Sequence, residues 1–477
     1  MMGYQNKGEQ KLFHYGINLE DRIRKNHPLR KIKEIIDFDF IKEEVKNLYG
    51  YNGNESIDPS VILRMMFLLF YYNVRSEREL MLTIPERLDW MWFLDYDLDE
   101  KVPDHSVLSK ARSRWGVEAF RQFFLKVLHA CCERGLVEGR KIFCDATFVE
   151  ANASNESVVE KNSLEFHLHK ACDELEEKLE EKDDGKKRYY RRVNTEKIST
   201  TDPDAGIRRH NKGRPKLRYK VHRAVDGKEE IITATETTAG DVNEGHLLQK
   251  LIDQHKENTK NEVDTVVGDS IYGTRKNIIE CVKRNIRPHL KDLLKTQKTS
   301  GRRDQIFGGE AFNYDKDKDI YICPAGKALK RRKCFHDRRA YEYVASPSEC
   351  STCTMKGQCT RGKFRTLKRH IEQEILDEGL RICCSLEARR DLKTRQHLME
   401  RSFAVGKTRY GLGRARWRRL WRVKIQELLT ATIQNIQKLM KHTQKPIKAL
   451  ASKLIYRYVY FFKSINRMLD KVIFAIS

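Results

Sequence analysis

The sequence contains no run of about 18 uncharged apolar residues, which excludes an ordinary transmembrane helix. Its first ten residues lack the apolar stretch of a secretory signal, so we expect a cytoplasmic protein. In that compartment thiols stay reduced, so the 12 cysteines are expected to serve packing or metal binding rather than disulfides.

Acidic residues are the scarcer charged class. The 477 residues include 93 Lys and Arg against 68 Asp and Glu, which gives a formal net charge of +25. This excess predicts a polyanionic partner. A basic surface that only keeps the protein in solution is the alternative. The length predicts about three domains of about 150 residues each, or one large domain with insertions.

Helical periodicity of apolar residues dominates the sequence from residue 58 to about 135, and Asp58 followed by Pro59 marks a helix start. Within this region, residues 106–115 combine a helix start with several basic residues. They predict either a helix that lies in a DNA groove or a packing helix with a solvated basic face. We expect an all-α, DNA-binding N-terminal domain over residues 1–135.

Strand and helix patterns alternate after residue 140. β-Branched and aromatic runs predict strands at 141–150, 216–226, 231–238, 263–269 and 286–290. Helical patterns occupy 243–258 and 277–285 between them. Asp226-Gly227 is predicted to form a two-residue hairpin turn. This order predicts an α/β fold, with a mixed sheet of antiparallel and parallel strands flanked by helices.

Two segments interrupt this α/β pattern. Residues from about 155 to 215 are rich in Glu and Lys and predict an inserted helix or a hairpin of charged helices, whereas 301–375 are basic and contain cysteines. Helices are predicted after them, at 386–405 and 414–441. The expected units are therefore, in chain order, 1–135, a core at 136–300, the Cys-rich insertion 301–375, the core's C-terminal helices 376–442, and a basic aromatic tail 443–477.

Asp145 and Asp269 stand at strand positions where packing does not require a carboxylate. A carboxylate beside apolar residues costs free energy unless it is hydrogen-bonded or bound to a cation. Two of them on neighbouring strands could hold Mg²⁺ through oxygen ligands, and a capped turn or loop is the alternative for each. The nearby acids Asp226 and Asp241 are assigned instead to the hairpin turn and to a helix N-cap.

Glu400 is the candidate for a third carboxylate. It flanks a predicted buried stripe of Leu392, Met399 and Phe403, so its side chain could point into the same cleft. Lys407 follows two helical turns later. Two strands and a helix that carry Asp, Asp and Glu suit phosphoryl transfer with two metal ions about 3.5–4 Å apart. Lys407 would contact a phosphate as a point charge.

These motifs resemble the DDE transposases of bacterial insertion sequences. The resemblance rests on Asp145-Ala-Thr, on Gly268-Asp269-Ser-Ile-Tyr-Gly and on the spacing between Glu400 and Lys407, and it spans residues from about 15 to 442. It implies an RNase H-like catalytic fold that cleaves DNA at element ends and transfers the freed 3′-hydroxyl into target DNA. It also implies that Asp145, Asp269 and Glu400 are catalytic ligands of two Mg²⁺ ions, for which Mn²⁺ can substitute.

The family pattern also has a Tyr and an Arg upstream of the glutamate, and these are not matched. Lys393 and Gln396 occupy the two positions, and Arg395 stands one residue away from the expected arginine. The roles of that Tyr and Arg are therefore not transferred.

The partners implied are double-stranded DNA with terminal inverted repeats and a target DNA. We expect a homodimer on the DNA and no membrane partner. A metal-dependent nuclease of the same fold is one alternative, and it would release nicked DNA without joining it. The other is a catalytically silent DNA-binding protein descended from a transposase.

Cys350 and Cys353 form a Cys-x₂-Cys knuckle, a spacing typical of zinc sites. Cys359 lies six residues further on, and Cys323 could supply the fourth thiolate of a tetrahedral structural zinc site. Cys334 is left over. A set of reduced, partly buried thiols is the alternative.

Basic residues dominate 407–424, which contains no acidic residue. We expect DNA phosphates to be contacted by Lys407, Arg409, Arg414 and Arg416. Trp417 and Trp421 interleave with these residues and are expected to face the core. A second basic cluster, at 327–339, adjoins the cysteines.

Overall fold

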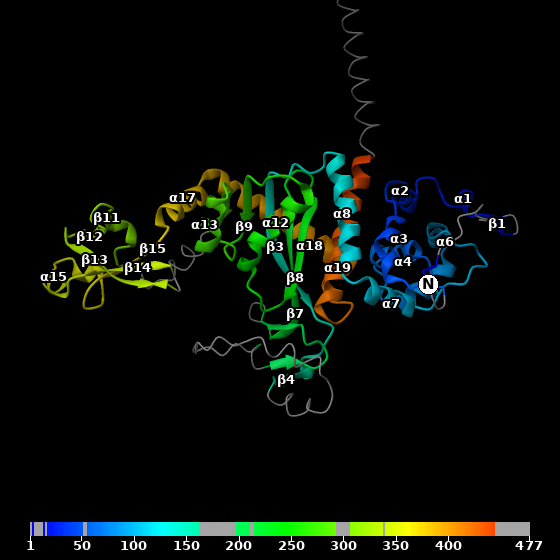
Figure 1. Cartoon of the computed structure of the whole chain (residues 1–477), viewed down its shortest axis with the longest axis horizontal. Helices are drawn as coiled ribbons and strands as arrows, with labels where there is room; N and C mark the ends of the chain where they lie inside the picture. The colour runs from blue at the N-terminus through cyan, green and yellow to red at the C-terminus, as the bar shows by residue number, and fades with distance from the viewer. Residues whose placement is uncertain are drawn as a thin grey trace, which may run out of the picture.

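The computed structural model describes residues 2–3, 13–14, 17–50, 55–161, 194, 197–209, 214–291, 306–336 and 339–443. The predicted charged helices at 162–193 and the tail beyond Thr443 lie outside the described residues. Helices of the N-terminal region lie at one end, a mixed sheet lies in the middle and a small antiparallel sheet lies at the other end (Figure 1). Among the described helices, none has the length and hydropathy to cross a membrane.

The N-terminal region is helical, as its periodicity predicts. Its elements are β1 (Phe13–His14), β2 (Ile17–Asn18), α1 (Leu19–Arg22), α2 (Pro28–Ile35), α3 (Phe40–Val45), η1 (Lys46–Leu48), α4 (Pro59–Tyr71), α5 (Glu77–Thr83), η2 (Ile84–Glu86), α6 (Leu88–Leu94), α7 (Ser106–Trp115) and α8 (Glu118–Glu133). Asp58 caps α4 by accepting a hydrogen bond from the Ser60 backbone N–H, with Pro59 in the first helical position. Gly116, at φ +65°, separates α7 from α8.

The side of helix α7 that carries Arg112 packs against the rest of the protein. This guanidinium is 2% exposed, forms an ion pair with Glu77 and lies 3.9 Å from the centroid of the Trp417 ring. Because its charge is used inside the protein, Arg112 is not available to a DNA groove. Of the two interpretations of residues 106–115, packing is the one that these contacts support.

The central sheet has six strands: β3 (Lys141–Glu150), β6 (Gly206–Arg208), β7 (Lys216–Asp226), β8 (Ile232–Ala239), β9 (Thr265–Gly268) and β10 (Arg287–Leu290). Their order is β10-β9-β3-β7, and β8 and β6 both pair with the free side of β7. The β3–β7 and β7–β8 pairs are antiparallel, whereas β3–β9 and β9–β10 are parallel. This mixed sheet confirms the predicted α/β, RNase H-like class.

Helices cover both faces of the central sheet. Alternate residues of β3 serve the two faces, because successive side chains of a strand point in opposite directions. Ile142 and Cys144 pack in one cluster with α12 (Leu248–Thr259), α13 (Arg275–Lys283) and α17 (Gln373–Cys383). The short helix η4 (Glu244–Leu247) directly precedes α12. Phe143 belongs to the opposite cluster, with α18 (Leu386–Tyr410) and α19 (Leu420–Thr443).

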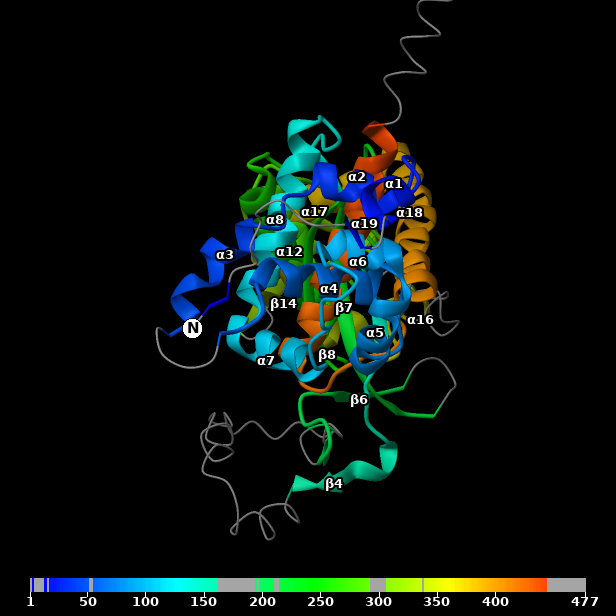
Figure 2. The same cartoon turned by 90° about the vertical axis from the view of Figure 1, so that its right-hand side faces the viewer.

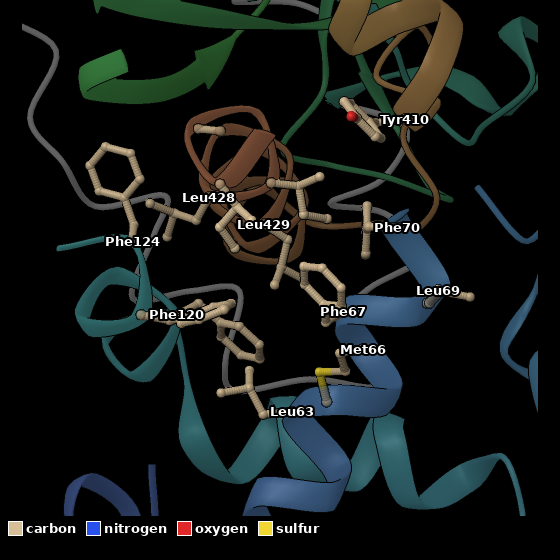
Figure 3. Close-up of a cluster of buried hydrophobic side chains, with 14 of the residues drawn as sticks. Leu63, Met66, Phe67, Leu69, Phe70, Phe120, Phe124, Tyr410, Leu428 and Leu429 are labelled. Atoms are coloured by element: carbon tan, nitrogen blue, oxygen red, sulfur yellow. The ribbon is translucent and has the colours of Figure 1, made fainter. Parts of the chain in front are cut away.

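The second of these clusters runs without a break into the N-terminal helices. Figure 3 shows side chains of α4, α8 and α19 meeting at one place, among them Phe67, Phe120 and Leu429. All three are no more than 1% exposed. The N-terminal helices and one face of the central sheet therefore share a single hydrophobic core.

The hairpin between β7 and β8 differs from the predicted two-residue turn. Strand β7 ends at Asp226 and β8 begins at Ile232, so the connection is longer. The Asp226 carboxylate is buried and accepts hydrogen bonds from the backbone N–H groups of Gly139 and Lys228, at 2.7 and 2.9 Å. It ties the connection to the start of β3 instead of forming a tight turn.

Two other predictions about helix starts were wrong. Asn243, not Asp241, caps η4, because its side chain accepts the Gly245 N–H. The last helix begins at Leu420 rather than at 414. Residues 413–415 instead form backbone hydrogen bonds with the end of β3. The Glu150 N–H donates to the Gly413 carbonyl at 3.0 Å, and the Ala415 N–H donates to the backbone carbonyl of Glu150 at 2.7 Å.

The described part of the charged insertion includes a two-stranded ribbon. At the charged insertion, the short helix η3 (Asn155–Ser157) leads into β4 (Val158–Glu160), which pairs with β5 (Lys197–Ser199). This ribbon projects beyond the central sheet, where β4 is seen in both views (Figures 1 and 2). A ribbon rather than a helix therefore forms the described base of this insertion.

The Cys-rich insertion is a five-stranded antiparallel sheet in sequence order. It contains η5 (Gly309–Ala311), β11 (Asn313–Asp315), β12 (Ile320–Ile322), β13 (Ala328–Phe335), β14 (Ala340–Ala345), α15 (Pro347–Ser351), α16 (Lys356–Cys359) and β15 (Thr366–His370). In its described part, the insertion has a core of its own with four buried residues: Phe312, Leu329, Tyr343 and Ala345. Helix α17 then carries the chain back to the central sheet.

Candidate active site

Asp145 and Asp269 lie on adjacent strands of the central sheet. Asp145 is in the middle of β3, and Asp269 directly follows β9. Each carboxylate is held by a local backbone group: the Ala146 N–H donates to Asp145 Oδ1 at 2.8 Å, and the Ile271 N–H donates to Asp269 Oδ1 at 2.9 Å. The parallel pairing of β3 and β9 brings the two aspartates to one place.

A third carboxylate at this place comes from Glu244. Ligand oxygens of Asp145, Glu244 and Asp269 all lie within 4.8 Å of one another. Glu244 is the first residue of η4, is 8% exposed and forms an ion pair with Lys220 at 3.1 Å. The sequence interpretation missed it, because a glutamate in the first turn of a helix is ordinarily explained by the helix dipole.

Burial raises the pKa of Asp145 to about 6. The Arg395 guanidinium and the Ala146 N–H act in the opposite direction, and the neighbouring carboxylates of Asp269 and Glu244 raise the pKa further. Such crowding of acids is unfavourable unless a cation compensates it. The pKa shift therefore fits a place that is built for positive charge.

Arg395 occupies part of that place. Its Nη1 lies 2.7 Å from Asp145 Oδ2, and the side chain is 15% exposed. This arginine is the one that stands next to the expected family position. The spacing of residues along the sequence does not predict its contact with Asp145, because that contact depends on how α18 packs against β3.

Glu400 lies on the same helix but is exposed and is not among the three clustered carboxylates. It follows Arg395 by five residues, so it points about 140° away from Arg395 around the helix axis. The predicted stripe is otherwise confirmed, since Met399 and Phe403 are buried.

The loops that carry Glu244 and Asp269 are held together by Asn277. Its side-chain amide donates to the carbonyls of Gly245 and Tyr272, at 2.8 and 2.9 Å. A Cβ atom on Gly245 would lie only 2.7 Å from the Ile271 carbonyl oxygen, so only glycine permits this close approach. The position of Glu244 beside Asp269 is thus fixed by packing and by hydrogen bonds.

Tyr272 follows Asp269 by three residues and packs with Cys144 of β3 in the hydrophobic cluster on one face of the sheet. It is fully buried, and among the described residues its hydroxyl has no hydrogen-bond partner. Burial raises the pKa of this hydroxyl far above its usual value, and Cys144, Glu244, Asp145 and Asp269 add to the increase. Buried hydroxyl groups nearly always donate a hydrogen bond, so the missing acceptor of Tyr272 is unusual.

A second group of possible metal ligands, His289, Glu387 and Asp391, has another use. Asp391 contacts His289 Nδ1 at 2.6 Å and Lys141 Nζ at 2.9 Å, and Glu387 contacts Arg287 at 3.2 Å. Cationic side chains already neutralise these carboxylates. They hold α18 against β10 and β3.

Comparison with known protein families gives two matches to this chain. A family model described as a transposase domain (DUF772) matches residues 17–114, and a model described as a transposase DDE domain matches residues 322–440. The chain belongs to the DDE transposases. Asp145, Glu244 and Asp269 of this DNA transposase lie between the two matched ranges. No curated protein matches the chain significantly.

In this transposase the four predicted zinc ligands line one small cavity of about 20 Å³: Cys323, Cys350, Cys353 and Cys359. Cys323 begins a tight turn in which the Lys327 backbone N–H donates to its Sγ at 3.3 Å, and Gly326 adopts φ +76°. Cys334 does not line the cavity. The thiols do not form one of the groups whose ligand atoms all lie within 4.8 Å of one another among the described residues.

Three of the four predicted DNA-contacting residues are exposed: Lys407, Arg409 and Arg414. Although Lys407 is exposed, the surrounding protein reduces the solvation of its ammonium, and this loss, together with the nearby guanidiniums of Arg218 and Arg223, lowers its pKa. Arg416 is different. Its guanidinium lies 2.6 Å from Asn73 Oδ1 and also donates to the Val74 carbonyl, so it fastens the α18–α19 connection to the N-terminal helices.

The two tryptophans pack as predicted. Trp417 makes an edge contact with Phe70, at 5.7 Å between ring centroids, and both Trp417 and Trp421 pack against the large core.

Proposed function

We propose that this transposase cleaves DNA at the ends of its element and joins the freed 3′-hydroxyl to target DNA, with Asp145 and Asp269 as ligands of Mg²⁺. The observation that carries the proposal is the convergence of carboxylate oxygens on adjacent strands of a mixed sheet. The two transposase-domain matches support the reaction class.

The residues fit a hard divalent cation. Mg²⁺ prefers carboxylate oxygens, and this cluster supplies them beside an O–H donor without a partner. When bound, two such ions, for which Mn²⁺ can substitute, would stabilise the attacking and leaving oxygens of an in-line displacement. The resemblance assigns the third carboxylate to Glu400, and we retain that assignment as part of the proposal.

The chain's own cations have separate roles in this scheme. Arg395 restrains the Asp145 carboxylate before DNA binds. Lys407, Arg409 and Arg414 bind the phosphates of double-stranded DNA that carries the terminal inverted repeats, or of the target. Arg416 positions the connection that follows α18 and carries Arg414. Two chains acting on two element ends would form a homodimer on DNA.

The test is cleavage and joining of a duplex that carries the inverted repeats flanking the coding region. Asp145→Asn and Asp269→Asn are each expected to lower the rate by roughly 10³-fold or more, and Glu400→Gln by a similar factor. Asp264→Asn, a half-exposed acid just before β9, is the matched control and should retain the rate within about twofold.

Three results would decide against the proposal or part of it. Retained cleavage in Asp269→Asn would overturn it. Nicking by the wild-type protein without joining would identify a nuclease of the same fold. Binding of end DNA without cleavage in Mg²⁺ or Mn²⁺ would identify a silent DNA-binding descendant.

We also propose that Cys323, Cys350, Cys353 and Cys359 hold one structural zinc ion. The tight turn at Cys323 and the Cys-x₂-Cys knuckle present thiols from separate segments to one cavity of about 20 Å³. Elemental analysis is expected to find about one zinc ion per chain in the wild-type protein and in Cys334→Ser. Cys353→Ser should lose it, and equal zinc contents in all three proteins would refute the site.

A further inference from the structure

We infer that Glu244 is a metal ligand of the catalytic centre together with Asp145 and Asp269. This inference rests on the proposed function and adds a residue to it. Neither the spacing of the motifs nor the two domain matches point to Glu244. Its evidence is its place in the fold.

Specific hydrogen bonds and a close backbone contact position the carboxylate of Glu244 at the site. The η4 start is joined to the Asp269 loop by Asn277, which donates to the carbonyls of both segments. The absence of a side chain at Gly245 lets the two backbones approach closely. A glutamate needed only at a helix N-terminus would not require either feature.

The charge balance favours a cation at this place. Lys220 pairs with Glu244 at 3.1 Å and Arg395 pairs with Asp145 at 2.7 Å. Among the described residues, Asp269 has no ion-pair partner. Three carboxylates thus face two cationic side chains, and one negative charge is left for a ligand to neutralise.

Tyr272 gives an independent indication of a ligand. Its buried hydroxyl lacks an acceptor among the described residues, although buried polar groups nearly always have a partner. The hydroxyl lies near enough to Asp145, Glu244 and Asp269 for their charges to act on it, so an anionic oxygen ligand of a metal held there could accept its hydrogen bond.

The experiment measures Mn²⁺ affinity of the full-length protein without DNA, by electron paramagnetic resonance of the free ion. Glu244→Gln is expected to weaken binding by about tenfold or more, and Asp269→Asn by a similar factor. Glu236→Gln is the matched control, because Glu236 is also a buried glutamate paired with lysines on the same sheet. It should bind within about twofold of the wild type.

The outcomes separate this inference from the proposed function. Wild-type affinity in Glu244→Gln, with lost affinity in Asp269→Asn, would overturn the role of Glu244 and leave the proposed function standing. A wild-type protein that binds no Mn²⁺ at millimolar concentration would overturn both. If Glu244→Gln fails to fold, Glu244→Asp keeps the charge and moves the carboxylate by one methylene. It should still bind several-fold more weakly, and wild-type affinity would refute the inference.

Discussion

The central sheet and the Cys-rich insertion are both sheets that carry candidate metal ligands, but they are held together differently. The acids of the central sheet rest between two large clusters of buried residues, one on each face. Among the described residues of the insertion, the hydrophobic core consists of four buried residues. In the first region the ligand oxygens already lie within 4.8 Å of one another, whereas the thiols of the second only line a cavity.

This difference shows what each metal would contribute. Large hydrophobic cores can hold charged groups close together, because packing offsets the cost of crowding them. A small sheet buries too little surface for that and gains its stability from a cross-link or a metal. Magnesium would therefore serve chemistry on a sheet that is stable without it, and zinc would serve the fold of the insertion.

The largest expected effect is the loss of the buried ion pair that supports the central sheet. Arg223 is fully buried and binds Glu427 at 2.7 and 2.9 Å, so Arg223→Met leaves a buried carboxylate without its partner. We expect a loss of about 3–5 kcal/mol in the free energy of unfolding, measured by urea denaturation.

The control for this variant is an exposed pair in the insertion. Arg331→Met removes a surface contact with Asp319 and should cost less than about 1 kcal/mol. Similar losses in the two variants would contradict the contrast between the regions.

A pair of identical substitutions sharpens the comparison. Leu429 and Leu329 are both completely buried, the first in the large core and the second in the insertion. Leu429→Ala is expected to lower the global free energy of unfolding by about 2–5 kcal/mol. Leu329→Ala should leave the global transition nearly unchanged and lower amide-exchange protection only within 306–370. A global loss in Leu329→Ala would mean that the insertion unfolds together with the core.

The smallest effect is a gain of stability at the acid site. Burial raises the pKa of Asp145 to about 6, above its usual 3.8, so the folded metal-free protein binds a proton more tightly than the unfolded chain. The stabilisation is complete below pH 4 and is lost as the pH rises through 6. In EDTA at pH 7.5, Asp145→Asn is expected to be more stable than the wild type by about 1–3 kcal/mol.

This gain should shrink toward zero between pH 6 and pH 4, as thermal unfolding at a series of pH values would show. Asp264→Asn should change stability by less than about 0.5 kcal/mol at every pH. A destabilised Asp145→Asn in EDTA at pH 7.5 would show that Arg395 outweighs burial.

Much of the fold follows from local patterns in the sequence. The strands β3, β7, β8, β9 and β10 and the helix α4 lie where alternation, periodicity and capping predict them. The prediction of a two-residue turn after Asp226 was wrong because the Asp226 side chain accepts a hydrogen bond from Gly139, a residue 87 positions away. The predicted start of α19 was wrong because residues 413–415 form backbone hydrogen bonds with the end of β3 instead of a helix. Both errors come from contacts that no local pattern contains.

The acid site was predictable in part for the same reason. Asp145 and Asp269 interrupt apolar strands, and a local pattern reveals that. Glu244 has an ordinary local explanation, and only the approach of η4 to the Asp269 loop gives it another. Arg395 required the placement of α18 across the sheet, and Glu400 remains a prediction of the family resemblance.

The shared core has a consequence for the time course of synthesis. Helix α8 ends at Glu133, and its partner α19 begins at Leu420, nearly 300 residues later. At about 5–20 residues per second, the ribosome needs roughly 15–60 s to deliver the second helix after the first. During that interval the nascent N-terminal helices expose the apolar surface that α19 will cover. We therefore expect chaperone capture of this surface and the rate of translation to affect the yield of active molecules.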